Sequence, residues 1–240
     1  MVKMVSPLFQ ITNFLHRHHR CMLCRLPVDT PDQHWCQPCL ARFPRTPYCH
    51  GCGTTTLTMT EYCGRCLTRP PPWQRCYRLG EYRFPLRQLV HKFKFGHQFW
   101  LARPLGTLLA QAIPEPAPLL LPVPLHPWRQ LTRSFNQSTL LATAIAEATG
   151  SRCQPDLLRR TRHNPAQHQL NKAQRQTNLR DAFRLRKPIV RPSSPLPSHV
   201  ALVDDVVTTG STLSVLTRLL LAEGVERVDI YCLCYTPAGK

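Results

Sequence analysis

Two groups of residues in this sequence could do chemistry: a carboxylate pair followed by a hydroxyl-rich turn, and a set of regularly spaced cysteines. The first group lies in VALVDDVVTTGSTL at 200–213, where Asp204 and Asp205 end an apolar run and polar residues lead into a helical pattern. Free amides and hydroxyls at a helix start bind phosphate, because they donate hydrogen bonds at the positive end of the helix dipole. Carboxylates repel phosphate but accept hydrogen bonds from sugar hydroxyls or position hydrated magnesium. The segment therefore predicts a sugar-phosphate site.

Two other interpretations of this segment are weaker. A simple helix N-cap needs one Ser, Thr, Asp or Asn, whereas this turn carries a run of them around Gly210. A Walker-type nucleotide loop needs a lysine directly after its glycine, and Ser211 stands there.

The second group consists of eight cysteines arranged as four C-x2-C pairs. Two such turns supply four thiolates to one tetrahedral zinc ion, which leaves no open position for a substrate. We therefore predict two structural zinc sites from sequential pairs, while spacing alone also allows an interleaved arrangement or a ligand role for His34 or His50. Iron–sulfur clusters and redox-active dithiols are the alternative uses of such cysteines. The pairs are Cys21/Cys24, Cys36/Cys39, Cys49/Cys52 and Cys63/Cys66.

Charge and hydropathy limit the class of partner and the compartment. The chain has 31 Lys and Arg against 13 Asp and Glu, a net charge of +18, which predicts an anionic partner: nucleic acid, an anionic membrane surface or a phosphorylated small molecule. The first twenty residues lack the apolar run of a secretory signal, so we expect a cytoplasmic, reducing location. No apolar run approaches the roughly 18 residues of a membrane-spanning helix, and peripheral attachment at the inner face of the membrane stays open.

The positions of proline and of apolar residues predict two parts. Residues 1–69 contain the N-terminal segment and a double zinc ribbon, a proline linker follows at 70–72, and 76–240 form the second domain. Strands alternate with helices in the second part, which predicts a mostly parallel α/β sheet flanked by helices. The segment 84–95 mixes helical and strand spacing, and 204–210 is expected as a loop. The expected strands are 119–123, 200–203 and 228–235, and the expected helices are 100–113, 136–149 and 211–222.

The segment VDDVVTTGST at 203–212 resembles the phosphoribosyl-pyrophosphate (PRPP) signature of type I phosphoribosyltransferases. Together with the cysteine pairs, three further segments resemble the ComF family of competence-related proteins, especially its GntX-type DNA-utilization members. These segments are VPLHPWRQLTRSFNQSTLLA at 123–142, QHQLNKAQRQTNLRDAFRL at 167–185 and HKFKF at 91–95. The resemblance implies a type I phosphoribosyltransferase-like domain behind the zinc ribbon.

The resemblance also implies residue roles. Asp204 and Asp205 would be the catalytic pair that contacts the ribose hydroxyls of PRPP, with magnesium as its companion ion. The segment 167–185 would close over the site. Ser134 stands where the family usually has glycine. The implied PRPP-binding residues are Val206, Val207, Thr208, Thr209, Gly210, Ser211, Thr212, Arg129, Arg133 and Arg175.

Three functions are compatible with these residues. The family implies a PRPP-binding factor for uptake or use of extracellular DNA, working with DNA-uptake proteins. Aromatic residues interleaved with Arg and Lys at 73–82 and 91–100 could contact single-stranded DNA, or could be a core with a charged exterior. The alternative is an active phosphoribosyltransferase that transfers ribose 5-phosphate to a nitrogen acceptor. The third is a domain that binds PRPP without turnover, since no acceptor motif is evident.

Overall fold

The computed structural model describes residues 20–30, 33–125, 135–160, 182–186 and 195–236. Its centre is a five-stranded sheet, ordered β1-β7-β6-β2-β3, in which all neighbouring strands are parallel. A separate antiparallel pair joins β4 and β5. The strands are β1 (Arg75–Glu81), β2 (Leu119–Pro122), β3 (Arg152–Cys153), β4 (Leu158–Arg160), β5 (Phe183–Leu185), β6 (His199–Val207) and β7 (Arg227–Tyr235).

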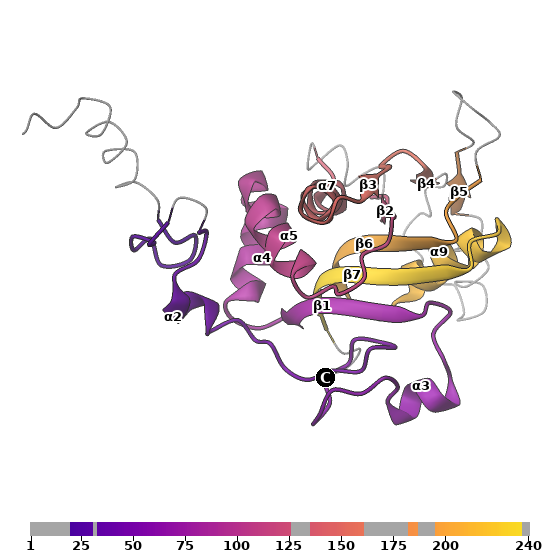
Figure 1. The fold of residues 1–240 in the computed structure, drawn as a ribbon, viewed down its shortest axis with the longest axis horizontal. Coiled ribbons are helices and arrows are strands. Elements are labelled where there is room, and N and C mark those ends of the chain that lie inside the picture. Colours follow the sequence, from indigo (N-terminus) through magenta and orange to yellow (C-terminus); the bar gives the residue numbers. More distant parts are fainter. Residues whose placement is uncertain (1–19, 31–32, 126–134, 161–181, 187–194, 237–240) are drawn as a thin grey trace, which may run out of the picture.

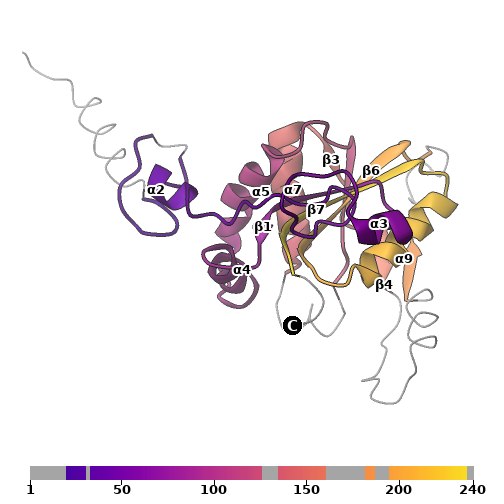
Figure 2. The same cartoon turned by 90° about the horizontal axis from the view of Figure 1, so that it is seen from below.

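Helices cover both faces of the sheet, as the near-continuous apolar runs of its central strands require. One face packs against α4 (Leu86–Phe95), α5 (Ala102–Ala110) and α7 (Gln137–Thr149), with the 3-10 helix η1 (Phe99–Leu101) beside them. The other face packs against α9 (Ser211–Ala222) and the β4–β5 pair. Figures 1 and 2 show the sheet between these two layers, so the expected α/β architecture is present.

Two local expectations needed refinement. The segment 84–95 is helical because Leu86, Leu89, Val90 and Phe93 fall at helical spacing and are all buried against the sheet. β6 extends through Val207, so the expected loop at 204–210 shrinks to its last three residues. The physical reason is pairing: β6 lies in the middle of the sheet, and its polar end continues the ladder with β7.

The ends of α7 and α9 follow capping rules. Asn136 caps α7 by accepting a hydrogen bond from Ser138 N at 3.0 Å, and Gly150 ends it in the left-handed conformation. Gly210, with φ +70°, turns the chain from β6 into α9. A residue with a Cβ atom would be strained at that position.

The second cysteine segment covers the outer edge of β1. Cys76 N donates to His50 O at 2.6 Å and Glu81 N donates to Pro44 O at 3.1 Å. These bonds satisfy backbone groups that an edge strand would otherwise expose. They also join the two predicted parts, 1–69 and 76–240, because the donors lie in β1 and the acceptors lie in the second cysteine segment.

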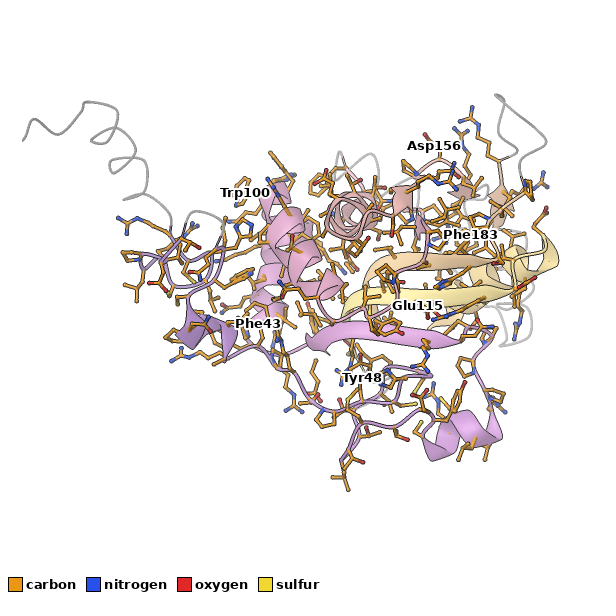
Figure 3. The ribbon with its side chains drawn as sticks, viewed as in Figure 1. Phe43, Tyr48, Trp100, Glu115, Asp156 and Phe183 are labelled. Atoms are coloured by element: carbon orange, nitrogen blue, oxygen red, sulfur yellow. The ribbon has the colours of Figure 1, made fainter. Side chains whose placement is uncertain are left out.

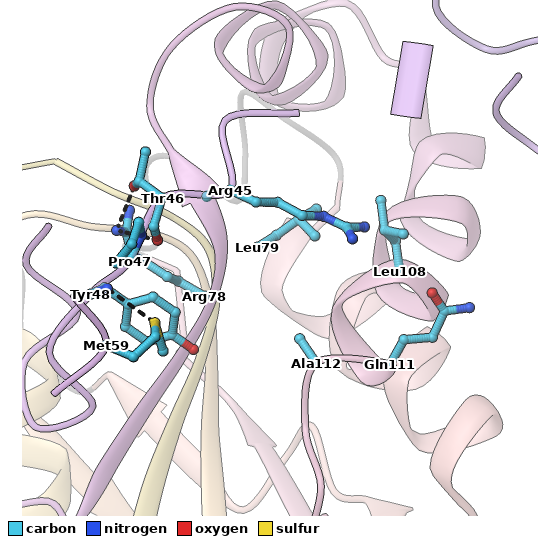
Figure 4. A pocket seen from close by; sticks show the side chains of 11 residues that line it. Arg45, Thr46, Pro47, Tyr48, Met59, Arg78, Leu79, Leu108, Gln111 and Ala112 are labelled. Atoms are coloured by element: carbon cyan, nitrogen blue, oxygen red, sulfur yellow. Dashed lines mark hydrogen bonds between the residues drawn. The ribbon is translucent and has the colours of Figure 1, made fainter. Parts of the chain in front are cut away.

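A buried arginine strengthens this junction. Arg78 is 2% exposed, and its Nη2 donates to the hydroxyls of Thr46 and Thr55, each at 3.0 Å. Both hydroxyls donate in turn to Glu81, and the guanidinium lies 4.8 Å from the ring centroid of Tyr48. Figure 4 shows Thr46, Tyr48 and Arg78 on one side of a hollow of about 400 Å³ and Leu108 of α5 on the other. Removing one residue of the network would leave a buried charge without its partner, which is costly. The network therefore fixes the second cysteine segment to β1.

The first cysteine segment contacts a different part of the molecule. Trp35 and Phe43 pack edge to face, 5.1 Å between centroids, and both belong to the core on the α4 and α5 side. Phe43 lies where the chain passes from α2 (Gln37–Leu40) toward the second segment, which contains α3 (Gly64–Thr68) (Figure 3). Within the described ranges, no helix combines the length and apolar character needed to span a lipid bilayer.

Candidate functional site

A cavity of about 560 Å³ opens at the carboxyl ends of β2 and β6. β2 continues toward α7 on one face of the sheet, whereas β6 continues into α9 on the other. Adjacent strands that lead to opposite faces leave a crevice between their ends, and open α/β sheets bind ligands at such a point. The topology therefore places the predicted phosphate turn at the mouth of a ligand-sized crevice.

The turn itself is available to a ligand. Every residue from Val206 to Thr212 lines the cavity. In the described part of the chain, the only hydrogen bond from an amide of 208–212 is a long one, from Ser211 N to Thr209 Oγ1 at 3.4 Å. Unpaired amides at the start of a twelve-residue helix favour an anion through both hydrogen bonding and the helix dipole.

The two carboxylates occupy different surroundings at the end of β6. Asp204 Oδ1 accepts from Ser138 Oγ at 3.0 Å and from Asp205 N at 2.9 Å. Asp205 Oδ1 forms an ion pair with Lys94 Nζ at 2.8 Å. Both side chains line the cavity, as do Lys94 and Ser138. The pair is thus held by α4 and α7 and faces the same space as the phosphate turn.

Burial, reinforced by the neighbouring negative charge of Asp205, raises the pKa of Asp204 to about 7. The pKa of an aspartate is ordinarily near 4. Without a ligand, Asp204 is therefore about half protonated at neutral pH. A cation or a set of hydroxyl donors in the cavity would favour the ionised form and release that proton.

The F-N-Q part of the segment at 123–142 positions the cavity walls. Asn136 caps α7 and also donates through Nδ2 to Val123 O at 3.1 Å, which ties the helix to the end of β2. Gln137, 1% exposed, donates to Lys94 O at 3.4 Å and so ties α7 to α4. These two residues therefore support the site.

Among the charged and hydroxyl-bearing side chains that line the cavity, the sequence prediction missed Lys94, Ser138 and Arg160. Lys94 lies in the family-like segment HKFKF at 91–95, and Ser138 directly follows F-N-Q. Neither pattern indicated that these two side chains contact the carboxylate pair. Arg160 lies in β4 and had no signal. The predicted Arg129, Arg133 and Arg175, and most of the predicted closing segment 167–185, lie outside the described residues.

The eight paired cysteines form two clusters, each from sequential pairs. In each cluster the four Sγ atoms lie within 4.8 Å of one another, and the described residues place no histidine in either. Tetrahedral Zn–S bonds of about 2.3 Å separate sulfurs by roughly 3.8 Å. The Cys24–Cys36, Cys49–Cys66 and Cys52–Cys63 separations are 3.6, 3.8 and 3.8 Å. Each cluster therefore fits one metal ion, and the preferred sequential pairing is the one observed.

The chain is similar to several known proteins and to one family model. A family model described as "Phosphoribosyl transferase domain" matches residues 136–240, which contain the acid pair and the phosphate turn. A solved structure of glutamine PRPP amidotransferase from B. subtilis is 23% identical, covers 56% of this chain and 26% of its own, and has a TM-score of 0.40.

Curated relatives match along nearly the whole length. "DNA utilization protein YhgH" of Salmonella typhimurium is 38% identical over 90% of this chain and 96% of its own. The protein of the same name from Escherichia coli K12 is 37% identical over the same shares. "Competence protein F" of Haemophilus influenzae is 34% identical over 88% of this chain and 95% of its own. The chain therefore belongs to the ComF family of DNA-utilization and competence proteins, with a phosphoribosyltransferase domain.

Proposed function

We propose that this protein binds PRPP, or a closely related sugar phosphate, with magnesium in the cavity between β2 and β6, and that it serves the uptake or use of DNA in the cytoplasm. The observation that carries the proposal is an open turn with free amides, 208–212, directly beside a carboxylate pair. The names of the relatives support the DNA role.

Each part of the cavity has a distinct task in this proposal. The amides and hydroxyls of 208–212 bind the 5-phosphate, while Asp204 and Asp205 accept hydrogen bonds from the ribose hydroxyls. Lys94 holds Asp205 in place and adds a positive charge to the cavity wall. Bound magnesium would neutralise part of the ligand's pyrophosphate charge. In the two cysteine clusters we propose zinc, because four thiolates at these separations suit that ion.

The pKa of Asp204 leads to a test of this site. Because that pKa is about 7 and the ligand favours the ionised carboxylate, affinity for magnesium PRPP should rise as pH increases from about 6 to about 8. Below the pKa, the expected change approaches about tenfold per pH unit. Isothermal calorimetry in two buffers of different ionisation enthalpy measures both the affinity and the released proton.

The control removes the titrating group. PRPP has phosphate groups of its own that titrate near pH 6, so the Asp204→Asn variant should keep only that shallower dependence. A pH profile that is the same for wild type and Asp204→Asn would contradict the assignment of Asp204.

A second feature supports contact with single-stranded DNA. Phe95, Phe99 and Trp100 are 55%, 57% and 48% exposed, and Figure 3 shows Trp100 projecting from η1. From Tyr82 to Pro114 the chain carries five Lys or Arg and no Asp or Glu. Exposed rings can stack on bases while nearby cations bind the backbone. Of the two interpretations of 91–100, these exposures favour the nucleic-acid surface, whereas Trp73 at 7% exposure belongs to the core.

This surface predicts salt-dependent binding of an oligothymidylate strand. The logarithm of the association constant should fall with the logarithm of salt concentration, with a slope of about −0.7 for each neutralised phosphate. A Phe99→Ala/Trp100→Ala variant should bind at least about fivefold more weakly, since each stacked base contributes roughly 1–3 kcal/mol. Fluorescence anisotropy across a salt series measures both effects.

Leu57 supplies a matched control, because it is a large apolar side chain that is 99% exposed on the second cysteine segment. Leu57→Ala should bind the strand like wild type. Binding that does not change with salt, or equal losses in the Leu57 and aromatic variants, would contradict a stacking surface at η1.

A further inference from the structure

A second hollow, of about 620 Å³, lies on the far side of the phosphate turn. Its walls are α3 and the second cysteine cluster, the proline stretch 70–72, and one face of α9. It shares the residues from Val207 to Ser211 with the sugar-phosphate cavity. The turn therefore separates two hollows. The proposed sugar-phosphate ligand occupies the first of them.

Apart from two cysteines of the metal cluster, Cys52 and Cys66, the ionisable side chains around this second hollow that carry a charge at neutral pH are all basic. Arg65 and Arg69 approach from α3 and its C-terminal end, and Arg218 approaches from α9. No acidic side chain is among the described residues that line the hollow, and none of the three guanidinium groups has a carboxylate partner within the described part of the chain. Three cations facing one space repel one another unless an anion lies between them. Arginine is well suited to phosphate because its planar donors bind two oxygens at once.

The remaining walls offer hydroxyls and apolar surface. Ser211, Ser214 and Arg218 recur on one face of α9, so two hydroxyls lie along the same wall as the guanidinium. The prolines 70–72 and the aromatic residues Trp73 and Tyr235 also line the hollow. A phosphate alone would not use that apolar surface, whereas a nucleotide places a phosphate and a flat base at suitable ends of such a hollow.

We propose that the hollow between α3 and α9 binds a nucleotide through its phosphate, separately from the sugar-phosphate cavity. Arg65, Arg69 and Arg218 bind the phosphate, and the proline wall contacts the base. The nucleotide is either free or the 5′ end of a DNA strand, since both present the same phosphate. The three arginines do not line the cavity that holds Asp204, so the two sites have separate cations and share only the turn from Val207 to Ser211.

The experiment is calorimetry of the full chain with thymidine 5′-monophosphate, with saturating PRPP and magnesium present to fill the first cavity. Wild type should bind the nucleotide, and Arg65→Glu/Arg218→Glu should bind it at least tenfold more weakly. Arg42→Glu is the matched control, since Arg42 is exposed, follows a cysteine cluster and does not line the hollow. A milder Arg218→Gln variant, together with thermal melts and zinc content, separates loss of binding from loss of folding.

Titrations with further ligands identify which chemical group of the nucleotide the hollow binds. Thymidine without phosphate should not bind measurably, and inorganic phosphate should compete only weakly. Stronger binding of a 5′-phosphorylated oligothymidylate than of its 5′-hydroxyl counterpart identifies the strand end, and equal binding of the two identifies the free nucleotide as the ligand.

Three results would overturn the proposal. The first is an Arg65→Glu/Arg218→Glu variant that binds the nucleotide as tightly as wild type, and the second is complete displacement of the nucleotide by PRPP. The third is that wild type binds no nucleotide while the arginine variants lose zinc. In the last case the arginines would serve only to balance the cluster's thiolates. If PRPP itself gives no heat, the proposed function fails, and the nucleotide titrations of wild type and variant still decide this site.

Discussion

Replacing Asp204 and Asp205 together by asparagine is expected to weaken binding of magnesium PRPP by roughly 10²- to 10⁴-fold. Each carboxylate supplies charge-assisted hydrogen bonds, which contribute about 1.5–3 kcal/mol apiece, and 1.4 kcal/mol corresponds to a factor of ten. The asparagines keep the shape of the site but lose its negative charge, so the effect falls on the ribose and the metal. Calorimetry on wild type and variant with PRPP and magnesium measures it.

The single Asp204→Asn variant, which keeps the ion pair between Lys94 and Asp205, should remain folded and become slightly more stable at pH 8. The folded protein keeps the Asp204 proton up to pH about 7, whereas the unfolded chain loses it near pH 4. The folded state therefore binds more protons across that window, so stability falls as pH rises through it. Asparagine removes this loss, and the melting temperature at pH 8 should rise by a few degrees.

Asp156 provides a matched control, because it is an exposed aspartate outside the cavity (Figure 3). Asp156→Asn should bind PRPP like wild type. Equal heats from wild type and the Asp204/Asp205 variant would remove the sugar-binding assignment. The same proteins, assayed for pyrophosphate release with a panel of nitrogen bases, would distinguish binding from turnover.

Loss of the metal ion from the second cysteine cluster is expected to destabilise the whole domain. Structural zinc contributes on the order of 10–16 kcal/mol of apparent binding free energy, comparable to the entire stability of a typical domain. Cys66, 3% exposed, belongs to this cluster. Cys66→Ser should lower the melting temperature by about 10 °C or more and reduce zinc from two ions to one per chain.

The same variant should also weaken PRPP binding, because a chain of contacts joins this cluster to the phosphate turn. Trp73 Nε1 donates to Gly51 O, between two of the cluster's cysteines, at 2.6 Å. The far edge of the Trp73 ring lies against Gly210, so closely that a Cβ atom there would come within 2.8 Å of it. If the cluster collapses, the ring loses its anchor and the turn loses the surface against which it packs.

The first cluster supplies the comparison. Cys24 is exposed, and its segment packs through Trp35 and Phe43 on the α4 and α5 side, away from the phosphate turn. Cys24→Ser should therefore also lose one zinc ion but retain PRPP affinity. Elemental analysis, thermal melts and calorimetry on both variants test the distinction. Equal PRPP affinities in the Cys66 and Cys24 variants would show that the second cluster does not support the turn.

The proximity of the two cysteine clusters to different parts of the domain was not evident from residue spacing. Four C-x2-C pairs predicted two four-cysteine sites, and the pairing is local because each cluster closes within about twenty residues. The spacing did not show that the second segment would cover the edge of β1. That contact depends on Cys76 and Glu81 meeting His50 and Pro44, which are distant in sequence.

Local chemistry in the sequence determined the order of strand, turn and helix around Asp204, the caps of α7 and the cysteine clusters, because their partners are a few residues away or follow a short repeat. Pairing with β7 decided that the strand extends to Val207. The tertiary structure alone decided that Lys94 and Ser138 reach the acid pair, that the pKa of Asp204 rises, and that α3 and α9 enclose a second basic hollow. Those features depend on distances between helices that lie on different faces and edges of the sheet. Such distances follow from the packing of the whole core, which no short pattern encodes.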